Sequence, residues 1–115
     1  DHSSIQAGKW LMSLDTKRLK IIGNDTRIPY TAEILAFQNP EQYIHYKPKN
    51  RNYDDIEQLA LAKRRNLIML KIRKNKLHRR PDLKNFQEVK RFEDGPKIVF
   101  IYARPGFIDD LPNHG

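Results

Sequence analysis

Few residues of this chain are spaced for catalysis. Glu88 and Lys90 form the acid-x-lysine triplet that some metal-dependent nucleases use, but the nearest earlier acid, Asp82, lies only six residues away and follows no recognisable strand. His45 lies in a strand-like run and His78 in a basic segment, and the four histidines are not spaced as metal ligands. The absence of cysteine excludes thiol nucleophiles and zinc–thiolate sites. We therefore expect a protein that is not an enzyme and that needs no metal or cofactor.

Tyrosine side chains offer a second kind of chemistry. Tyr30, Tyr46 and Tyr53 lie close together in the sequence and could bring several aromatic faces to one pocket. Such a pocket holds a methylated ammonium by cation–π attraction, worth about 0.5–2 kcal/mol per contact. The alternative is that these tyrosines are half-buried strand residues whose hydroxyls reach water. Their spacing leaves both interpretations open.

Lysine and arginine side chains form the third candidate site. The net charge is +8, and residues 63–91 contain twelve basic and only two acidic residues, so the rest of the chain is slightly acidic. This asymmetry favours a surface that faces a polyanion such as DNA, RNA or an acidic partner. The alternative is a solvated helix face or a packing segment of a large assembly. The candidate nucleic-acid-binding residues are Lys63, Arg64, Arg65, Lys71, Arg73, Lys74, Lys76, Arg79 and Arg80.

Short strand-like segments in the first half of the chain must position the tyrosines. Apolar and β-branched residues predict strands at 9–14, 17–22, 30–37 and 42–46. The turn at 23–25 (Gly-Asn-Asp) supports this pattern, because glycine and asparagine tolerate positive φ. Four strands joined by short turns are typical of a meander or a small curved barrel.

The basic segment follows a predicted helix over residues 55–65, where acidic residues come first and basic residues last, as the helix dipole favours. The run 66–73 (NLIMLKIR) could extend this helix or form a buried strand, since short apolar runs do not declare their type. Helix is favoured because neither glycine nor proline interrupts residues 55–80. A late strand is predicted at 97–103 (KIVFIYA).

Together these elements predict an α+β, mainly β, fold: a small curved antiparallel barrel-like sheet with a C-terminal helix and an extra late strand. We expect a flexible lead-in at 1–8, one domain at 9–108 and a flexible tail at 109–115. No apolar run approaches the roughly 20 residues that cross a bilayer, and the first residues lack a signal-peptide pattern. We therefore expect an intracellular protein without a membrane partner.

Residues 30–55 also resemble a known family. The strings YTAEIL (30–35), YIHY (43–46) and NRNYDD (50–55) are similar to the chromo-barrel or tudor-knot domain of MRG-type and MYST-acetyltransferase-associated chromatin proteins. The resemblance implies a curved antiparallel barrel closed by a C-terminal helix, which acts in chromatin complexes in the nucleus. It also implies that Tyr30 and Tyr46 correspond to aromatics of a methyl-lysine cage and that Tyr53 lies beside it.

The same comparison of residues favours a polyanion over methyl-lysine as the ligand. Lys49 stands where methyl-lysine readers of this family have a cage tryptophan, and Ile56 replaces the usual closing tryptophan. The leading hypothesis is a noncatalytic chromatin-type module that binds nucleic acid or nucleosomes through its basic surface, with a degenerate aromatic pocket. The alternatives are a structural RNA-binding subunit of a ribonucleoprotein, and an interaction module that docks a protein partner through residues 98–102 or 54–72.

Overall fold

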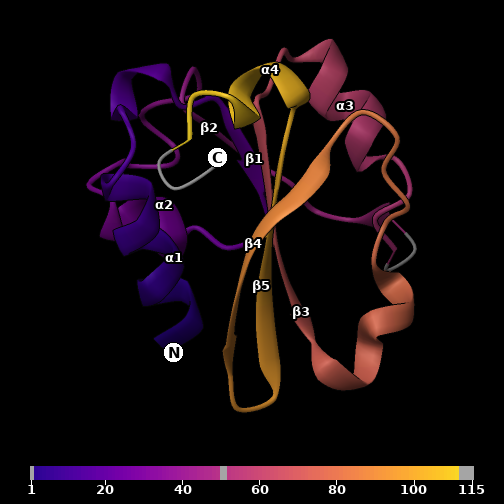
Figure 1. Ribbon diagram of the computed structural model, residues 1–115. Coiled ribbons are helices and arrows are strands. Elements are labelled where there is room, and N and C mark those ends of the chain that lie inside the picture. Colours follow the sequence, from indigo (N-terminus) through magenta and orange to yellow (C-terminus); the bar gives the residue numbers. More distant parts are fainter. Residues whose placement is uncertain (1, 50–51, 112–115) are drawn as a thin grey trace.

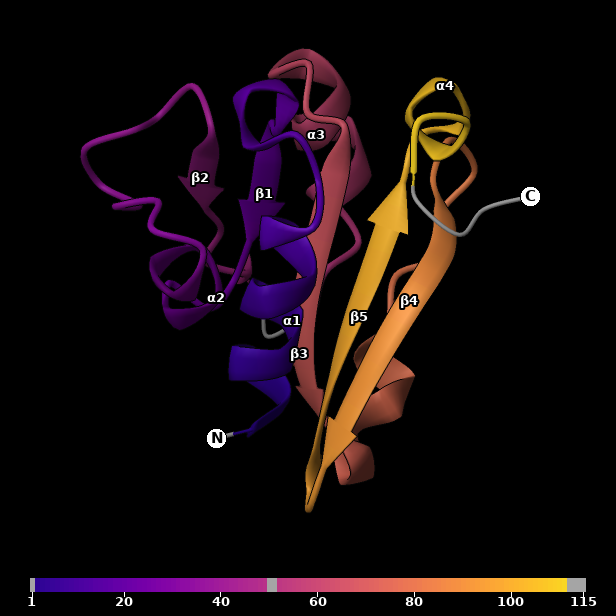
Figure 2. The ribbon, with the colours of Figure 1, turned by 60° about the vertical axis from the view of Figure 1, so that its left-hand side comes forward.

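The fold is a five-stranded mixed sheet with helices on both faces (Figure 1). The computed structural model describes residues 2–49 and 52–111. In chain order the elements are α1 (His2–Met12), η1 (Thr16–Arg18), β1 (Ile21–Gly23), α2 (Arg27–Thr31), β2 (Tyr43–His45), α3 (Ile56–Ala62), β3 (Leu67–Arg73), η3 (Lys74–Arg79), β4 (Gln87–Asp94), β5 (Lys97–Ala103) and α4 (Pro105–Ile108). Helices α1 and α2 cover one face of the sheet, and α3 covers the other (Figures 1 and 2).

The strand order is β2-β1-β3-β5-β4. Strand β1 pairs in parallel with both β2 and β3, whereas β5 is antiparallel to β3 and β4. The chain therefore leaves β1 toward one side to form β2 and then crosses back to form β3 on the other side. Figure 2 shows the arrowheads of these three strands pointing the same way. Their carboxyl ends consequently meet at one edge of the sheet.

Strand β3 is buried on both faces because each face of the sheet has its own hydrophobic cluster. Leu67 and Met69 pack into the cluster beneath α1 and α2. Ile68, Leu70 and Ile72 pack into the cluster beneath α3. A strand covered on both sides has a continuous apolar sequence instead of an alternating one. The expectation that residues 66–73 extend a helix is therefore wrong, and the alternative, a buried strand, is correct.

The α+β class, a helix near the C-terminus and the late strand are confirmed. The sheet is mixed and is not closed into a barrel. The physical reason is the pairing of β1, β2 and β3: parallel neighbours need crossover connections, which open a sheet to helices on its faces instead of curling it into a meander.

The first predicted strand, at 9–14, is mostly helix, because α1 runs from His2 to Met12. Residues 2–8, expected as part of a flexible lead-in, belong to the same helix. Its buried residues recur at helical spacing, and most are small: Ser3, Ser4, Ala7, Gly8 and Leu11. These small residues bring α1 so close to α2 that a Cβ on Gly8 would lie 2.4 Å from Cβ of Thr31.

The predicted strand at 30–37 does not form. Residues 27–31 are helix α2, and Glu33 follows it with φ of 64°, a left-handed conformation that a strand excludes. The strand predicted at 42–46 is confirmed as β2, and the helix predicted at 55–65 is confirmed as α3. The segment 17–22 forms a 3-10 turn followed by the start of the short strand β1.

The predicted tail at 109–115 is described only as far as Leu111, which is buried against the core, and residues 112–115 lie outside the described part. In the described part of the chain, no helix is long and apolar enough to span a membrane.

The close approach of α1 and α2 generates a testable prediction. Gly8→Ala would place its methyl group against Thr31 and 2.8 Å from the carbonyl oxygen of Ile28, which is backbone and cannot move aside. Overpacking of this kind costs about 1–3 kcal/mol, more than the roughly 1 kcal/mol that alanine gains over glycine within a helix. We expect a lower free energy of unfolding in urea titrations.

Gly106→Ala is the matched control for this substitution, because a Cβ at Gly106 meets nothing within 4 Å. The control variant should be as stable as the wild type or slightly more stable. Equal stability of the Gly8 and Gly106 variants would contradict the tight contact between α1 and α2.

Candidate anion-binding site at the carboxyl edge of the sheet

The carboxyl edge of the parallel strands is the first place to look for a site. In open α/β sheets, ligands bind outside the carboxyl ends of the strands, where successive connections leave in opposite directions. Here that point lies between β1 and β3. The residues that follow β1 include Asn24 and Asp25, Pro48 follows β2, and β3 ends at Arg73.

Asn24 separates the ends of β1 and β3. Its side-chain oxygen accepts a hydrogen bond of 2.8 Å from the backbone N–H of Lys71, and its amide donates one of 3.0 Å to the Lys71 carbonyl. The side chain thus replaces the backbone of β1 in the sheet after Gly23. The β1 chain can therefore turn away from β3 without leaving backbone groups of β3 unpaired.

Asp25 follows Asn24, where the chain turns away from β3, and its carboxylate accepts hydrogen bonds from three neighbouring side chains. Its carboxylate accepts hydrogen bonds from Ser4 Oγ at 2.7 Å, from Lys71 Nζ at 3.2 Å and from Arg27 Nε at 3.1 Å. Lys71 Nζ also donates to Ser4 Oγ at 3.0 Å. Only 8% of the side chain of Asp25 and 8% of that of Lys71 is exposed, so this is a largely buried ion pair.

The Asp25 network keeps its carboxyl group ionised. Burial acts to raise the pKa of Asp25, but the hydrogen bonds from Arg27, Ser4 and Lys71 outweigh it and hold the pKa well below its usual range. A carboxylate with so low a pKa is a poor base. The Ser4 hydroxyl that donates to it is therefore not activated as a nucleophile, and the network orients cations instead.

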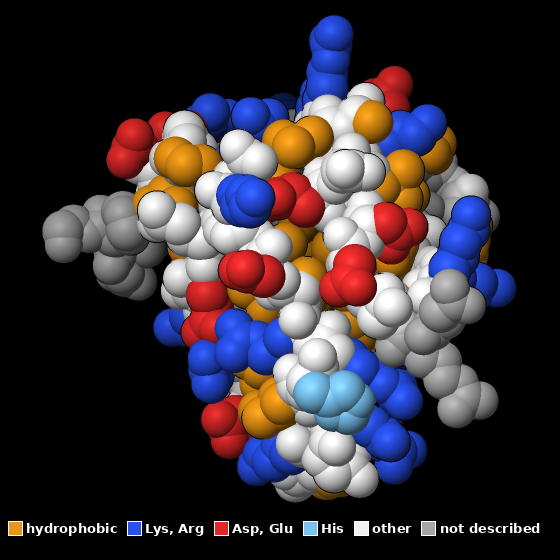
Figure 3. Space-filling view, turned by 90° about the vertical axis from the view of Figure 1, so that its right-hand side faces the viewer, with side chains coloured by type: hydrophobic (Ala, Val, Ile, Leu, Met, Phe, Trp, Pro, Cys, Tyr) orange, Lys and Arg blue, Asp and Glu red, His pale blue; other side chains and the backbone are white. Residues whose placement is uncertain are grey.

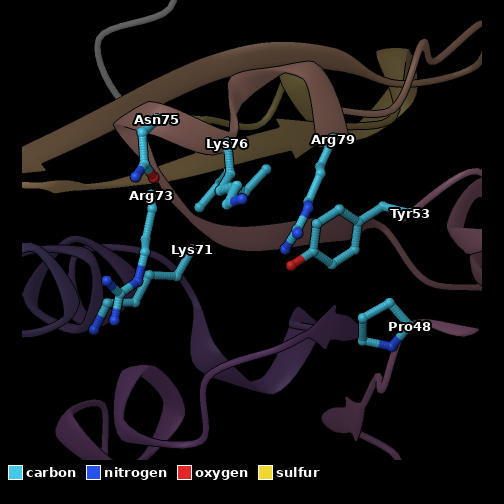
Figure 4. A pocket seen from close by; sticks show the side chains of 8 residues that line it. Pro48, Tyr53, Lys71, Arg73, Asn75, Lys76 and Arg79 are labelled. Atoms are coloured by element: carbon cyan, nitrogen blue, oxygen red, sulfur yellow. The ribbon is translucent and has the colours of Figure 1, made fainter. Parts of the chain in front are cut away.

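Two adjoining hollows surround this network, and they share Lys71 and Arg73. We call the larger one, of about 520 Å³, the basic pocket (Figure 4); it is lined by Pro48, Tyr53, Lys71, Ile72, Arg73, Asn75, Lys76 and Arg79. We call the smaller one, of about 250 Å³, the Asp25 hollow; it is lined by Asn24, Asp25, Arg27, Lys71, Arg73 and Lys97. Figure 4 shows Lys71 and Arg73 extending to the same side of the basic pocket, while Arg79 extends toward Tyr53.

Positive charge exceeds negative charge in these hollows. Among the residues that the structure describes, Arg73, Lys76, Arg79 and Lys97 have no carboxylate partner within 4 Å. The pKa of Lys97 is lowered, first by the positive charge of Lys71 and then by desolvation and by the positive charge of Arg73. The site thus concentrates cations that repel one another, and a bound anion would relieve that repulsion.

Three of the predicted basic residues lie away from this site. Lys63, Arg64 and Arg65 precede β3, whose seven residues span about 20 Å at roughly 3.3 Å each. Arg65 is buried and donates hydrogen bonds to the carbonyls of Glu41 (2.8 Å) and Pro40 (3.4 Å). It therefore holds the loop before β2 in place.

Lys74 and Arg80 have carboxylate partners, in contrast to Arg73, Lys76, Arg79 and Lys97. Lys74 Nζ lies 3.3 Å from Glu93, and the Arg80 guanidinium lies 2.8 Å from Glu88. Arg80 also lies over the ring of Phe100, 4.1 Å from its centroid. Arg91 covers the same ring and shares Glu88, so these arginines cover Phe100 of β5, which belongs to the hydrophobic cluster beneath α3. In Figure 3 basic side chains gather over the lower part of this side of the molecule, below a group of acidic ones.

The three tyrosines do not form one pocket. Tyr46 and Tyr53 are buried in the cluster beneath α3 with ring centroids 6.0 Å apart, and the Tyr46 hydroxyl donates a hydrogen bond to Asp55. Tyr53 reaches the wall of the basic pocket and accepts a hydrogen bond of 3.2 Å from the Asn24 amide. Tyr30 is 68% exposed and lines a different hollow, with Phe37.

The other candidate residues for catalysis are dispersed. Glu88 binds Arg80 and Arg91, and His45 is partly buried with Nδ1 3.5 Å from the Tyr43 hydroxyl. His78 is exposed on η3. Within residues 2–49 and 52–111, no three His, Asp or Glu side chains are grouped to hold a metal ion.

Sequence reasoning found four of the pocket cations and missed the residues that complete the site. Lys71, Arg73, Lys76 and Arg79 were predicted from charge density alone. The missed residues were Ser4, Asn24, Asp25, Arg27 and Lys97. The one available signal was the 23–25 turn, since polar residues directly after a short apolar strand are typical of a site at a strand end.

Comparison with known protein families, curated proteins and solved structures gave no match. The resemblance of residues 30–55 to chromo-barrel domains therefore stays a prediction. The site is defined by the geometry of this chain alone.

The depressed pKa of Asp25 predicts how stability depends on pH. The ordinary pKa of an aspartate is about 3.9, and the folded value lies below it. The stabilisation is therefore complete above about pH 4 and is lost as the pH falls below that value. Asp25→Asn removes the charge that the Lys71 ammonium, the Arg27 guanidinium and the Ser4 hydroxyl all face, so we expect it to lower the free energy of unfolding at pH 7 by about 3 kcal/mol.

Urea unfolding followed by circular dichroism between pH 7 and pH 2 checks this prediction. The Asp25 variant should lose less stability than the wild type below pH 4. Asp110→Asn is the control, because the Arg18–Asp110 pair is exposed and should contribute no more than about 1 kcal/mol. Parallel pH profiles of the wild type and the Asp25 variant would contradict the assigned network.

Proposed function

We propose that this protein binds nucleic acid without catalysis, through the basic pocket and the surface around it. The observation that carries the proposal is the group of four cations, Arg73, Lys76, Arg79 and Lys97, that have no carboxylate partner in the described structure. The edge that they occupy is where open α/β sheets bind ligands. The basic pocket is concave and has no carboxylate in its lining, which favours an anionic ligand.

Phosphate is the anion that suits these side chains best. Arginine presents a planar set of donors that matches phosphate oxygens, and lysine adds a mobile point charge. The excess positive charge of the whole chain, +8, favours a polymer of phosphates over an isolated anion, because long-range attraction grows with the charge of both partners. Contacts of this kind position a protein on nucleic acid and carry little sequence information.

The proposal includes DNA and RNA as ligands. Its extension to chromatin and to a nuclear location rests on the resemblance of residues 30–55 to chromo-barrel domains. An RNA-binding role in a ribonucleoprotein would use the same cations, so binding to matched DNA and RNA strands separates these two cases.

A second candidate function, contact with a protein partner, is favoured by one exposed apolar group. Tyr30, Leu35 and Phe37 are 68%, 44% and 80% exposed and line a hollow of about 310 Å³. Grouped exposed apolar side chains often mark interaction surfaces. Strand β5 (97–103) is not available for such a contact through its edges, because it is paired with β3 and β4 on both sides.

Salt dependence tests the nucleic-acid proposal. A plot of the logarithm of the binding constant against the logarithm of the salt concentration should be linear, with a slope of about −0.7 for each phosphate contact to a single strand. The variant Arg73→Gln/Lys76→Gln/Arg79→Gln should bind a single-stranded oligonucleotide at least about tenfold more weakly, and the magnitude of its slope should fall by about 2. Fluorescence anisotropy at several salt concentrations measures both quantities.

The control removes the same net charge away from the pocket. Lys63, Lys84 and Lys90 are exposed and do not line either hollow, so the triple glutamine variant at these positions should keep most of the affinity. Equal losses in both variants would show nonspecific attraction by net charge. An affinity of the wild type that does not change with salt would contradict phosphate binding altogether.

A further inference from the structure

We propose that the basic pocket binds a phosphate monoester, the terminal phosphate of a nucleic-acid strand or the phosphate of a nucleotide, in preference to the internal phosphodiesters of a strand. This inference rests on the proposed function and specifies its ligand.

The shape of the basic pocket suits a phosphate group at the end of a strand. The basic pocket is a concave site of about 520 Å³, within the range of roughly 300–1,000 Å³ that is typical of sites for small ligands. Internal phosphates of a duplex lie on a convex backbone and continue into the chain on both sides. A terminal phosphate can enter a concave site because only one of its oxygens continues into a strand. The pocket therefore fits the end of a strand or a free nucleotide.

The number of cations at the pocket suits a phosphate monoester better than a phosphodiester. A phosphate monoester carries a charge of about −1.5 to −2 at pH 7 and has three strong acceptor oxygens, whereas a phosphodiester carries −1. Arg73, Lys76 and Arg79 line the basic pocket and have no carboxylate partner in the described structure, and Lys97 is the register partner of Arg73 in the sheet. Lys71 also lines the pocket, but it is paired with Asp25. These side chains come from the end of β3, from η3 and from the start of β5. Donors that approach from several directions suit a phosphate group with three unesterified oxygens.

Asp25 sets the position of the phosphate within the two hollows. Its carboxylate already occupies Lys71 and Arg27, at 3.2 Å and 3.1 Å, and would repel a second anion in the Asp25 hollow. The basic pocket has no carboxylate in its lining. The phosphate is therefore expected in the basic pocket, which Arg73 lines together with Lys76 and Arg79.

The remaining lining predicts weak preference among bases. Pro48, Ile72 and Tyr53 supply apolar contacts beside the cations. Tyr53 is only 8% exposed and already packs against Tyr46, so its ring face is not free for stacking with a base. The terminal nucleoside can rest on this wall without its base edges being read.

The test compares strand ends at constant total charge. Fluorescence anisotropy would measure binding of one single-stranded sequence with a 5′-phosphate, with a 3′-phosphate and with hydroxyl ends. A hydroxyl-ended strand two nucleotides longer is the charge-matched control. We expect at least one phosphorylated strand to bind about tenfold tighter than this control, and Arg79→Gln or Lys76→Gln to abolish the difference. Lys84→Gln, outside both hollows, should retain it, and circular dichroism verifies that each variant is folded.

A competition experiment separates the two sources of the monoester. Adenosine 5′-monophosphate that displaces the labelled strand, where adenosine does not, would show that a free nucleotide suffices. Displacement only by strands with a terminal phosphate would assign the site to nucleic-acid ends. Either result supports the monoester site.

Different experimental results would contradict the monoester site and the binding of nucleic acid. Equal affinity for phosphorylated and charge-matched hydroxyl-ended strands would overturn the monoester site and leave nucleic-acid binding intact. Binding of the nucleotide without binding of any strand would support the monoester site and overturn the nucleic-acid proposal. Absence of binding to every one of these ligands would overturn both.

Discussion

The buried pair between Asp25 and Lys71 is the interaction on which the rest of the structure depends. It joins the segment after β1 to the end of β3, and Ser4 and Arg27 tie helices α1 and α2 to the same carboxylate. Burying two charges costs several kcal/mol each, and their attraction offsets this cost only when the remaining hydrogen bonds are satisfied. The three donors around Asp25 meet that condition. The pair therefore links the packing of one face of the sheet to the geometry of the edge where the cations gather.

Basic residues serve two physically different purposes in this chain. Arg65 holds a loop through backbone carbonyls, and Arg80 and Arg91 cover Phe100 while sharing Glu88. The latter two side chains shield apolar surface of β5 from water. Arg73 and Arg79 have no such partner in the described structure. Basic residues of the same segment thus differ in their surroundings: Arg80 and Arg91 pack and pair with Glu88, whereas Arg73 and Arg79 line the basic pocket.

The helices and strands that were predicted correctly are those whose pattern lies within a short stretch of sequence. Helix α3 and strands β2 and β5 follow from propensity and charge placement, and they were found. Helix α1 was missed because its buried face is made mainly of small and polar residues such as Ser4 and Gly8, which hydrophobic periodicity does not detect. Strand β3 was taken as helix because a strand buried on both faces loses the alternation that identifies strands.

The site was harder to predict than the elements, because its members meet only through the topology. Parallel pairing brings the residue after β1 beside the end of β3, so Asp25 and Lys71 are neighbours although 46 residues separate them. The hairpin of β4 and β5 then adds Lys97 next to Arg73 in the sheet. Charge density alone identified Lys71, Arg73 and their successors in η3, since these are contiguous in the sequence.

The same topology relates the tyrosine-rich segment to the basic one. A parallel crossover from β2 to β3 must leave from the carboxyl edge of β2, so the connection through Pro48 and Tyr53 passes over the edge at which β1 and β3 diverge. Tyr53 thereby becomes a wall of the basic pocket instead of part of an aromatic cage, and its hydroxyl is held by the Asn24 amide. An amide that also pairs with the backbone of Lys71 couples this wall to the end of β3.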